Sequence, residues 1–98
     1  LKQAKVKLTY KMREDNNNYF VDITLRNTSS QIAFFNQLQF LNSMMSPIRP
    51  SFYTDNFFSL MPGEKKTVTI ETAKGKLKNG AVLVLKGWNI KRQEYKLK

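Results

Sequence analysis

The chain has 98 residues, of which 17 are lysine or arginine and 7 are aspartate or glutamate, so its formal net charge at pH 7 is +10. This length provides one hydrophobic core and excludes a second, so residues 1–98 are expected to form a single domain, and a hydrophobic fraction of 41% lies above the range of disordered chains. Cysteine and histidine are absent, which excludes disulfide bridges, thiolate and imidazole metal ligands, and histidine acid–base chemistry. We therefore expect no cofactor and no metal.

Two segments near the N-terminus alternate between apolar and polar positions. Residues 6–12 place an apolar side chain at every second position with lysines or a threonine between them, and residues 19–26 repeat the pattern with Phe20 as an exception on the polar side. A period of two with a charged outer face predicts half-buried strands. Residues 14–18 are turn formers and separate the two segments.

The central part of the chain predicts a further strand and two breaks. Residues 27–30 form a loop by composition, and residues 32–41 resume with the mixed alternation of a strand that is covered on both faces for part of its length. Pro47 and Pro50 bracket a short extended piece, because proline fixes its own φ angle and restrains the residue before it.

The C-terminal part predicts three more strands. Pro62-Gly63 is a turn that leads into a strand over residues 65–72, and residues 74–80 are a loop that is rich in lysine and glycine and ends in Asn79-Gly80. Residues 81–90 are the most continuously apolar run, and residues 93–97 form a last strand. No useful length of chain has apolar residues at helical spacing, so the whole pattern predicts an all-β sandwich of about seven strands.

Membrane insertion is not expected from this sequence. No apolar run approaches the roughly 18 residues that a membrane helix needs, and the N-terminus lacks the apolar region of a signal peptide. The composition leaves the compartment open, with a periplasmic or extracellular location favoured. Because the chain starts without methionine and enters a strand-like pattern directly, we expect it to be a fragment of a longer chain.

A segment from residue 52 to residue 64 surrounds Asp55-Asn56 with aromatic rings, which are Phe52, Tyr53, Phe57 and Phe58. Asp55 is the one acid in an apolar setting, where a raised pKa would let it act as an acid. A lone carboxylate, however, lacks the partner that hydrolytic chemistry requires. We favour an Asx-turn at Asp55-Asn56, with one ring of each aromatic pair turned into the core, and we predict no catalytic residue.

The basic surface allows two interpretations. Lysines that alternate with apolar residues are typical of a solvated strand face, where they also discourage pairing with other chains. A nucleic-acid module would interleave stacking rings with its cations, and Tyr10 and Tyr95 are conceivable platforms, although Tyr10 shares the inner face by parity. We therefore expect no specific nucleic-acid partner.

Trp88 is the single tryptophan and lies between Gly87 and Asn89. An exposed tryptophan can stack on a sugar ring, which would make the chain a carbohydrate-binding module with Tyr53 as a second contact. A tryptophan beside a long apolar run is more often part of the core or of a contact with a neighbouring domain, and we favour that interpretation. The candidate residues for sugar or interdomain contact are therefore Trp88, Tyr53, Asp55 and Asn56.

Three ordered segments resemble a known family. Residues 25–35 (LRNTSSQIAFF), 52–64 (FYTDNFFSLMPGE) and 87–90 (GWNI) resemble the C-terminal immunoglobulin-like domain of family 2 glycoside hydrolases, in particular the exo-β-glucosaminidase and β-mannosidase branch. There the segments read approximately NTSxxIAFF, YSDNYFxLxPGE and GWN. Thr54 stands where the family pattern has serine, and residues 91–98 extend past the point where many relatives end, so the resemblance gives them no role.

The resemblance implies an immunoglobulin-like antiparallel β-sandwich that acts as a non-catalytic accessory domain and packs on other domains of its parent enzyme. In the family the catalytic glutamates lie in an upstream barrel, so no catalytic residue transfers to this chain. The parent would be a glycosidase of the β-mannosidase, exo-β-glucosaminidase or β-galactosidase type, and the isolated domain is expected to be monomeric. On this interpretation residues 50–64 form a corner where the chain changes sheets, with the rings as anchors inside. The alternatives are a carbohydrate-binding module and a basic nucleic-acid-binding module.

Overall fold

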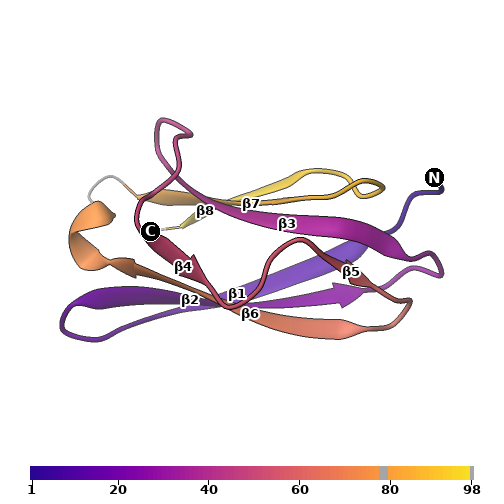
Figure 1. The fold of residues 1–98 in the computed structure, drawn as a ribbon, viewed down its shortest axis with the longest axis horizontal. Helices are drawn as coiled ribbons and strands as arrows, with labels where there is room; N and C mark the ends of the chain where they lie inside the picture. The colour runs from indigo at the N-terminus through magenta and orange to yellow at the C-terminus, as the bar shows by residue number, and fades with distance from the viewer. Residues whose placement is uncertain (78–79, 98) are drawn as a thin grey trace.

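Two four-stranded antiparallel sheets pack face to face in the structure, which is a computed structural model that describes residues 1–77 and 80–97 (Figure 1). The first sheet has the order β1-β2-β6-β4, and its strands are β1 (Val6–Glu14), β2 (Asn18–Asn27), β6 (Lys65–Ala73) and β4 (Ser51–Tyr53). The second has the order β5-β3-β7-β8, and its strands are β5 (Phe58–Leu60), β3 (Ala33–Asn42), β7 (Ala81–Lys86) and β8 (Gln93–Leu97). The predicted all-β sandwich is confirmed.

The alternating segments of the sequence form the expected strands because each has one apolar face to bury. Val21 and Ile23 of β2 lie directly opposite apolar residues of both β1 and β6, Leu25 lies opposite Leu8 of β1 and Lys66 of β6, and all three are at most 1% exposed. The second sheet contributes the facing half of the core, whose fully buried side chains include Leu38, Phe40, Leu83 and Leu85. Burial of each such side chain contributes about 1.5–3 kcal/mol.

The two continuously apolar segments are strands that are buried on both faces for part of their length, as predicted for residues 32–41. Val82 and Val84 of β7 and Leu41 of β3 form a second small cluster on the outer face of the second sheet. The apolar run of residues 81–90 is a strand only in its first part, since β7 covers residues 81–86. A Cβ atom at Gly87 would lie 3.1 Å from the Phe34 carbonyl oxygen, so the chain turns where only glycine fits.

The loop expected over residues 74–80 contains one short element. A 3₁₀ turn, η1 (Lys74–Lys76), follows β6. Asn79 of the expected Asn79-Gly80 pair lies outside the described residues. No helix among residues 1–77 and 80–97 is long and apolar enough to cross a bilayer.

The segment that carries the four rings changes sheets, as the sequence predicted. β4 belongs to the first sheet and β5 to the second, so residues 54–57 cross from one sheet to the other. Tyr53 and Phe58 pack against the core, whereas Phe52 and Phe57 are 65% and 62% exposed. One ring of each pair therefore anchors the crossover, which confirms the prediction of one inward ring per pair, while the description of the rings as inner anchors is wrong for Phe52 and Phe57. Successive strand residues point to opposite faces, so neighbouring rings cannot both turn inward.

One end of the sandwich gathers four segments that are distant in sequence. Residues 1–5, 28–32, 61–64 and 87–92 meet at the end where the N-terminus lies, on the right in Figure 1. Backbone hydrogen bonds connect these segments, namely Ala4 N to Asn89 O, Thr28 N to Lys5 O, and Gly63 N to Asn27 O. We call this end the N-terminal pole.

Candidate functional site

The four candidate residues from the sequence do not form one site. Tyr53 and Asn56 line a shallow groove beside β3, and Asp55 lies next to them in the crossover. Trp88 lies on the β7–β8 loop at the N-terminal pole. The structure therefore presents two separate surfaces, one at the crossover and one at the pole.

At the crossover, Asn56 and Tyr53 replace a missing strand. β5 pairs with β3 only between residues 33 and 36, which leaves the next part of the β3 edge without a partner strand. The Asn56 carboxamide accepts a hydrogen bond from Leu38 N at 2.8 Å and donates one to Leu38 O at 2.9 Å. The Tyr53 hydroxyl accepts a hydrogen bond from Phe40 N at 2.8 Å, and burial raises the pKa of Tyr53. Both side chains thus form hydrogen bonds with the backbone of β3.

Asp55 is an ionised surface carboxylate. Its Oδ2 lies 2.6 Å from Lys66 Nζ, and its Oδ1 accepts a hydrogen bond from Asn56 N at 2.8 Å. The hydrogen bond from Lys66 and then that from Asn56 lower the pKa of Asp55. The raised pKa considered from the sequence is therefore wrong, because a lysine of β6 that lies nearby only in the fold stabilises the charged form.

The predicted Asx-turn at the crossover is also corrected in detail. The side chains of Asp55 and Asn56 each accept a hydrogen bond from the N–H of the next residue, at 2.8 Å and 3.1 Å. An Asx-turn would need a bond from the residue two positions on. The bend is instead held by the salt bridge to Lys66 and by the contact of Asn56 with Leu38.

Trp88 is 69% exposed, so the core interpretation of this residue is wrong. Its ring packs on Phe35, with the ring centroids 4.3 Å apart and the planes inclined at 45°. Phe35 is itself 45% exposed and has a φ angle of 49°, in the irregular part of β3 where the register with β5 shifts. The two rings form an exposed aromatic pair. Of these two residues, only Trp88 was among the candidates predicted from the sequence.

Asn89 fixes the segment that carries Trp88. Asn89 is buried, its Oδ1 accepts a hydrogen bond from Phe34 N at 2.9 Å, and its Nδ2 donates to Ile32 O at 2.7 Å and to Lys2 O at 2.9 Å. The asparagine occupies the inner position and joins three segments, while the ring of the preceding residue lies at the surface. The hydrogen bonds of Asn89 therefore hold the Gly-Trp-Asn segment in place, with the tryptophan ring exposed.

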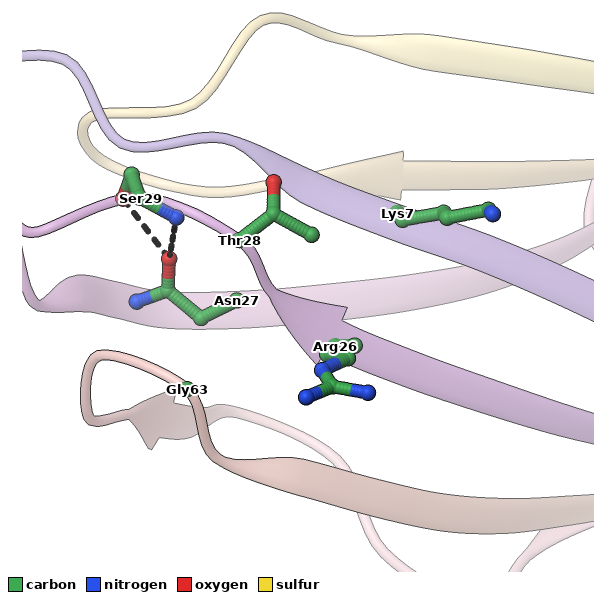
Figure 2. A pocket seen from close by; sticks show the side chains of 6 residues that line it. All are labelled: Lys7, Arg26, Asn27, Thr28, Ser29 and Gly63. Carbon is green, nitrogen blue, oxygen red and sulfur yellow. Dashed lines mark hydrogen bonds between the residues drawn. The ribbon is translucent and has the colours of Figure 1, made fainter.

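A hollow of about 470 Å³ lies between the strand ends of the first sheet at the N-terminal pole, and its lining residues are Lys7, Arg26, Asn27, Thr28, Ser29 and Gly63 (Figure 2). The buried Asn27 fixes its wall, since Asn27 Oδ1 accepts hydrogen bonds from Ser29 N at 3.0 Å and from the Ser29 hydroxyl at 2.7 Å. Asn27 Nδ2 donates to Gln31 O and Leu60 O. The sequence analysis did not identify this hollow.

Acidic side chains are dispersed over the surface. Asp22 lies 2.5 Å from Arg13 Nε, and the hydrogen bond from Arg13 lowers the pKa of Asp22. In the described part of the chain, no group of three or more acids lies close enough together to hold a metal ion. The arrangement can bind and position partners through its aromatic pair and its cations.

An antiparallel sandwich of two four-stranded sheets, in which the chain crosses between the sheets through two short strands, is an immunoglobulin-like β-sandwich domain. The chain belongs to the family of exo-β-D-glucosaminidase Ig-fold domains, whose model matches residues 1–90. The resemblance inferred from the sequence is therefore confirmed.

Solved structures of one enzyme agree with this family. The exo-chitosanase CsxA of Amycolatopsis orientalis, a family 2 glycoside hydrolase, matches with a TM-score of 0.89 and 28% sequence identity over 98% of this chain and 12% of that enzyme. A complex of a CsxA variant with PNP-β-D-glucosamine matches with the same TM-score, 27% identity and the same coverage. This chain thus corresponds to about an eighth of the enzyme's length. A comparison with curated protein sequences found no match.

Proposed function

We propose that this domain is a non-catalytic accessory domain of a family 2 glycosidase of the exo-β-glucosaminidase type, and that it packs on another part of its parent enzyme through Phe35 and Trp88. The observation that carries the proposal is the exposure of this stacked pair, 45% and 69%, on a backbone that buried hydrogen bonds hold rigid. Large aromatic rings on a fixed backbone are common anchors of protein interfaces, because burial of their area costs little side-chain entropy.

A scaffolding role is supported by the state of the carboxylates. Asp22 and Asp55 both form ion pairs and have lowered pKa values, so neither is suited to donate a proton near neutral pH. The length of CsxA supports the same role. This chain covers 12% of that enzyme, so the remaining 88% lies outside the matching region.

The test of the proposal uses the parent chain in its full length. Trp88→Ala is expected to lower the thermal unfolding temperature of the parent by about 1 °C or more, since an interface anchor is typically worth about 2 kcal/mol or more and a long chain has a large entropy of unfolding. Phe52→Ala is the matched control, because Phe52 is an equally exposed ring, at 65%, on β4. If the two variants unfold at the same temperature, the aromatic pair is not a docking surface.

A carbohydrate-binding role is the second candidate, and the exposure of Trp88 is the observation in its favour. Two features oppose it. Phe35 already covers part of the ring at a centroid distance of 4.3 Å, and a chain with a net charge of +10 repels the protonated amines of glucosamine oligomers. We expect no saturable change in Trp88 fluorescence when the 98-residue chain is titrated with glucosamine oligomers at pH 5.5. A saturable change, together with a loss of oligomer binding in Trp88→Ala when binding is measured by calorimetry, would establish the binding role instead.

A further inference from the structure

A row of cations crosses the outer face of the first sheet at the N-terminal pole. The strand register places Lys7 of β1 opposite Arg26 of β2, and Arg26 opposite Lys65 of β6. Residues that are directly opposite in an antiparallel sheet point to the same face, with Cβ atoms about 4.5–5.5 Å apart, and like charges in such positions destabilise the sheet. We call Lys7, Arg26 and Lys65 the cationic row.

On the rest of the same face, opposite positions carry uncharged residues or charges of opposite sign. Two positions further along β2, Thr24 lies between Thr9 and Thr67, and the next outward residue, Asp22, lies opposite Lys11. Asp22 also accepts hydrogen bonds from Arg13 at 2.5 Å and from the Thr69 hydroxyl at 2.8 Å. Within residues 1–77 and 80–97, the basic partners of the salt bridges are Arg13, Lys66, Lys74 and Arg92, and no member of the cationic row is among them. The row is therefore a local departure from charge balance.

The hollow of Figure 2 opens beside this row and is not packed by the domain itself. Lys7 and Arg26 line it, and Thr28 contributes a hydroxyl whose hydrogen bond to Lys5 O is long, at 3.4 Å. A Cβ atom at Gly63 would meet nothing within 4 Å, so open space borders the turn on this side. Cations around a preformed, polar hollow are suited to binding anionic groups that enter from outside.

The chemistry of the row selects carboxylates. The guanidinium group of Arg26 offers paired N–H donors that match the two oxygens of a carboxylate, and the two lysines add point charges on either side. A polynucleotide would require stacking rings among the cations. The neighbouring outward positions Thr9, Thr24 and Thr67 carry none, and Phe20 lies further along the face under the Arg13 guanidinium, at 4.4 Å from its ring centroid.

We propose that Lys7, Arg26 and Lys65 bind carboxylate side chains of an acidic surface on the adjoining part of the parent enzyme. The inference rests on the proposed function, because it assumes that the N-terminal pole faces the rest of the parent. The pole supports both surfaces together: the Phe35–Trp88 pair lies on its second-sheet side and the cationic row on its first-sheet side. Hydrogen bonds from Ala4 N to Asn89 O and from Thr28 N to Lys5 O connect the two sides. Charge complementarity then orients the domain, and the aromatic pair supplies the buried area.

A first experiment titrates the 98-residue chain with hexaglutamate and follows backbone amide shifts by NMR at 20 mM and 150 mM NaCl. Saturable shifts are expected at residues 7, 26–29 and 63–65, with a dissociation constant that increases at least about fivefold at the higher salt concentration. Arg26→Gln should weaken binding about tenfold, the cost of one charge-assisted bidentate contact. The matched control is Lys96→Gln, because Lys96 is an exposed cation on the outer face of β8 and should leave the affinity unchanged.

Three results of the titration would overturn the proposal. They are shifts spread evenly over all lysines, an equal loss of affinity in Arg26→Gln and Lys96→Gln, and tighter binding of a dodecathymidylate at the same residues. The last result would assign the row to nucleic acid.

A second experiment compares Arg26→Gln in two contexts. In the 98-residue chain the substitution relieves the repulsion between neighbouring cations, so its unfolding temperature should rise or stay the same. In the full-length parent the same substitution should lower the unfolding temperature, because a carboxylate loses its partner. A change of the same sign in both contexts contradicts the proposal. Failure of Trp88→Ala to destabilise the parent would instead contradict the packing function, so the two failures are distinguishable.

Discussion

At the residue scale, buried asparagines connect the loops of this domain. Asn27, Asn36 and Asn89 are at most 2% exposed, and each carboxamide donates to two backbone carbonyl groups. A buried amide nitrogen that donates both of its hydrogens in this way fixes loop geometry more strictly than an apolar side chain would, because an unmade bond costs about 1–3 kcal/mol. Asn89 holds the loop that carries Trp88, and Asn27 holds the β2–β3 loop beside the hollow.

Surface aspartates make the stability of the domain dependent on pH. Hydrogen bonds lower the pKa values of three of them: Asp15 through the Asn17 N–H, Asp22 through Arg13, and Asp55 through Lys66. A carboxylate whose pKa is lower in the folded state stabilises the fold above its unfolded-state pKa, near 3.9, and this contribution is lost as the pH falls through the folded-state value. Stability should therefore fall below about pH 4.

The urea midpoint at pH 6 and pH 3 provides the measurement for this effect. Asp55→Asn should show a smaller decrease between the two pH values than the wild-type chain, because one lowered pKa has been removed. Glu94→Gln is the control, because it also removes an acid from a salt bridge, in this case with Arg92 two positions earlier in the chain. An identical decrease in the wild type and in Asp55→Asn would show that the Lys66 contact does not contribute.

At the scale of elements, the edge of β3 depends on the crossover. Leu38 N, Leu38 O and Phe40 N bond to the side chains of Asn56 and Tyr53, and Phe40 O accepts a bond from Ile48 N at 3.0 Å. These bonds satisfy backbone groups that an unpaired edge would offer to another chain. The Tyr-Thr-Asp-Asn segment is thus a substitute for a short strand.

Removal of Asn56 tests this role. Asn56→Ala leaves the N–H and C=O groups of Leu38 without partners, so the free energy of unfolding should fall by about 1–3 kcal/mol, and the Leu38 amide should exchange with solvent faster. Asn16→Ala, in the exposed turn before β2, is the control and should change stability by less than about 0.5 kcal/mol. Urea unfolding and hydrogen exchange give the two measurements. Equal stability of the two variants would mean that water replaces the amide at no cost.

At the scale of the whole molecule, charge and exposed aromatic area are concentrated at the same end. The sequence has a net charge of +10, and its uncompensated part includes the cationic row at the N-terminal pole. The Phe35–Trp88 pair lies at this pole, whereas the crossover residues are used to close the sheet edge. The contacts that we propose for this domain therefore lie at one end of the sandwich, which fits the proposed accessory role in a much longer enzyme.

Most of the strand architecture could be predicted from the sequence. Alternation with a period of two depends on neighbouring residues, so it located β1, β2, β6 and β8 without knowledge of their partners. Proline and glycine located the turn before β6, and three short motifs were enough to identify the family. The turn between β1 and β2 also determines that Lys7 lies opposite Arg26, so two of the three residues of the cationic row follow from local information.

The remaining features were decided by tertiary structure, because they depend on contacts between residues that are distant in the chain. The hydrogen bond from Lys66 lowers the pKa of Asp55, and Asn89 occupies the inner position beside Trp88 by bonding to Lys2 and Ile32. The pairing of β2 with β6 adds Lys65 to the cationic row. Sequence alone determined the long strands, since a local pattern of burial is sufficient for them, whereas the three-residue strands β4 and β5 were not predicted. Only the packing of the two sheets decided which side chains face a partner, because exposure is a property of the assembled fold.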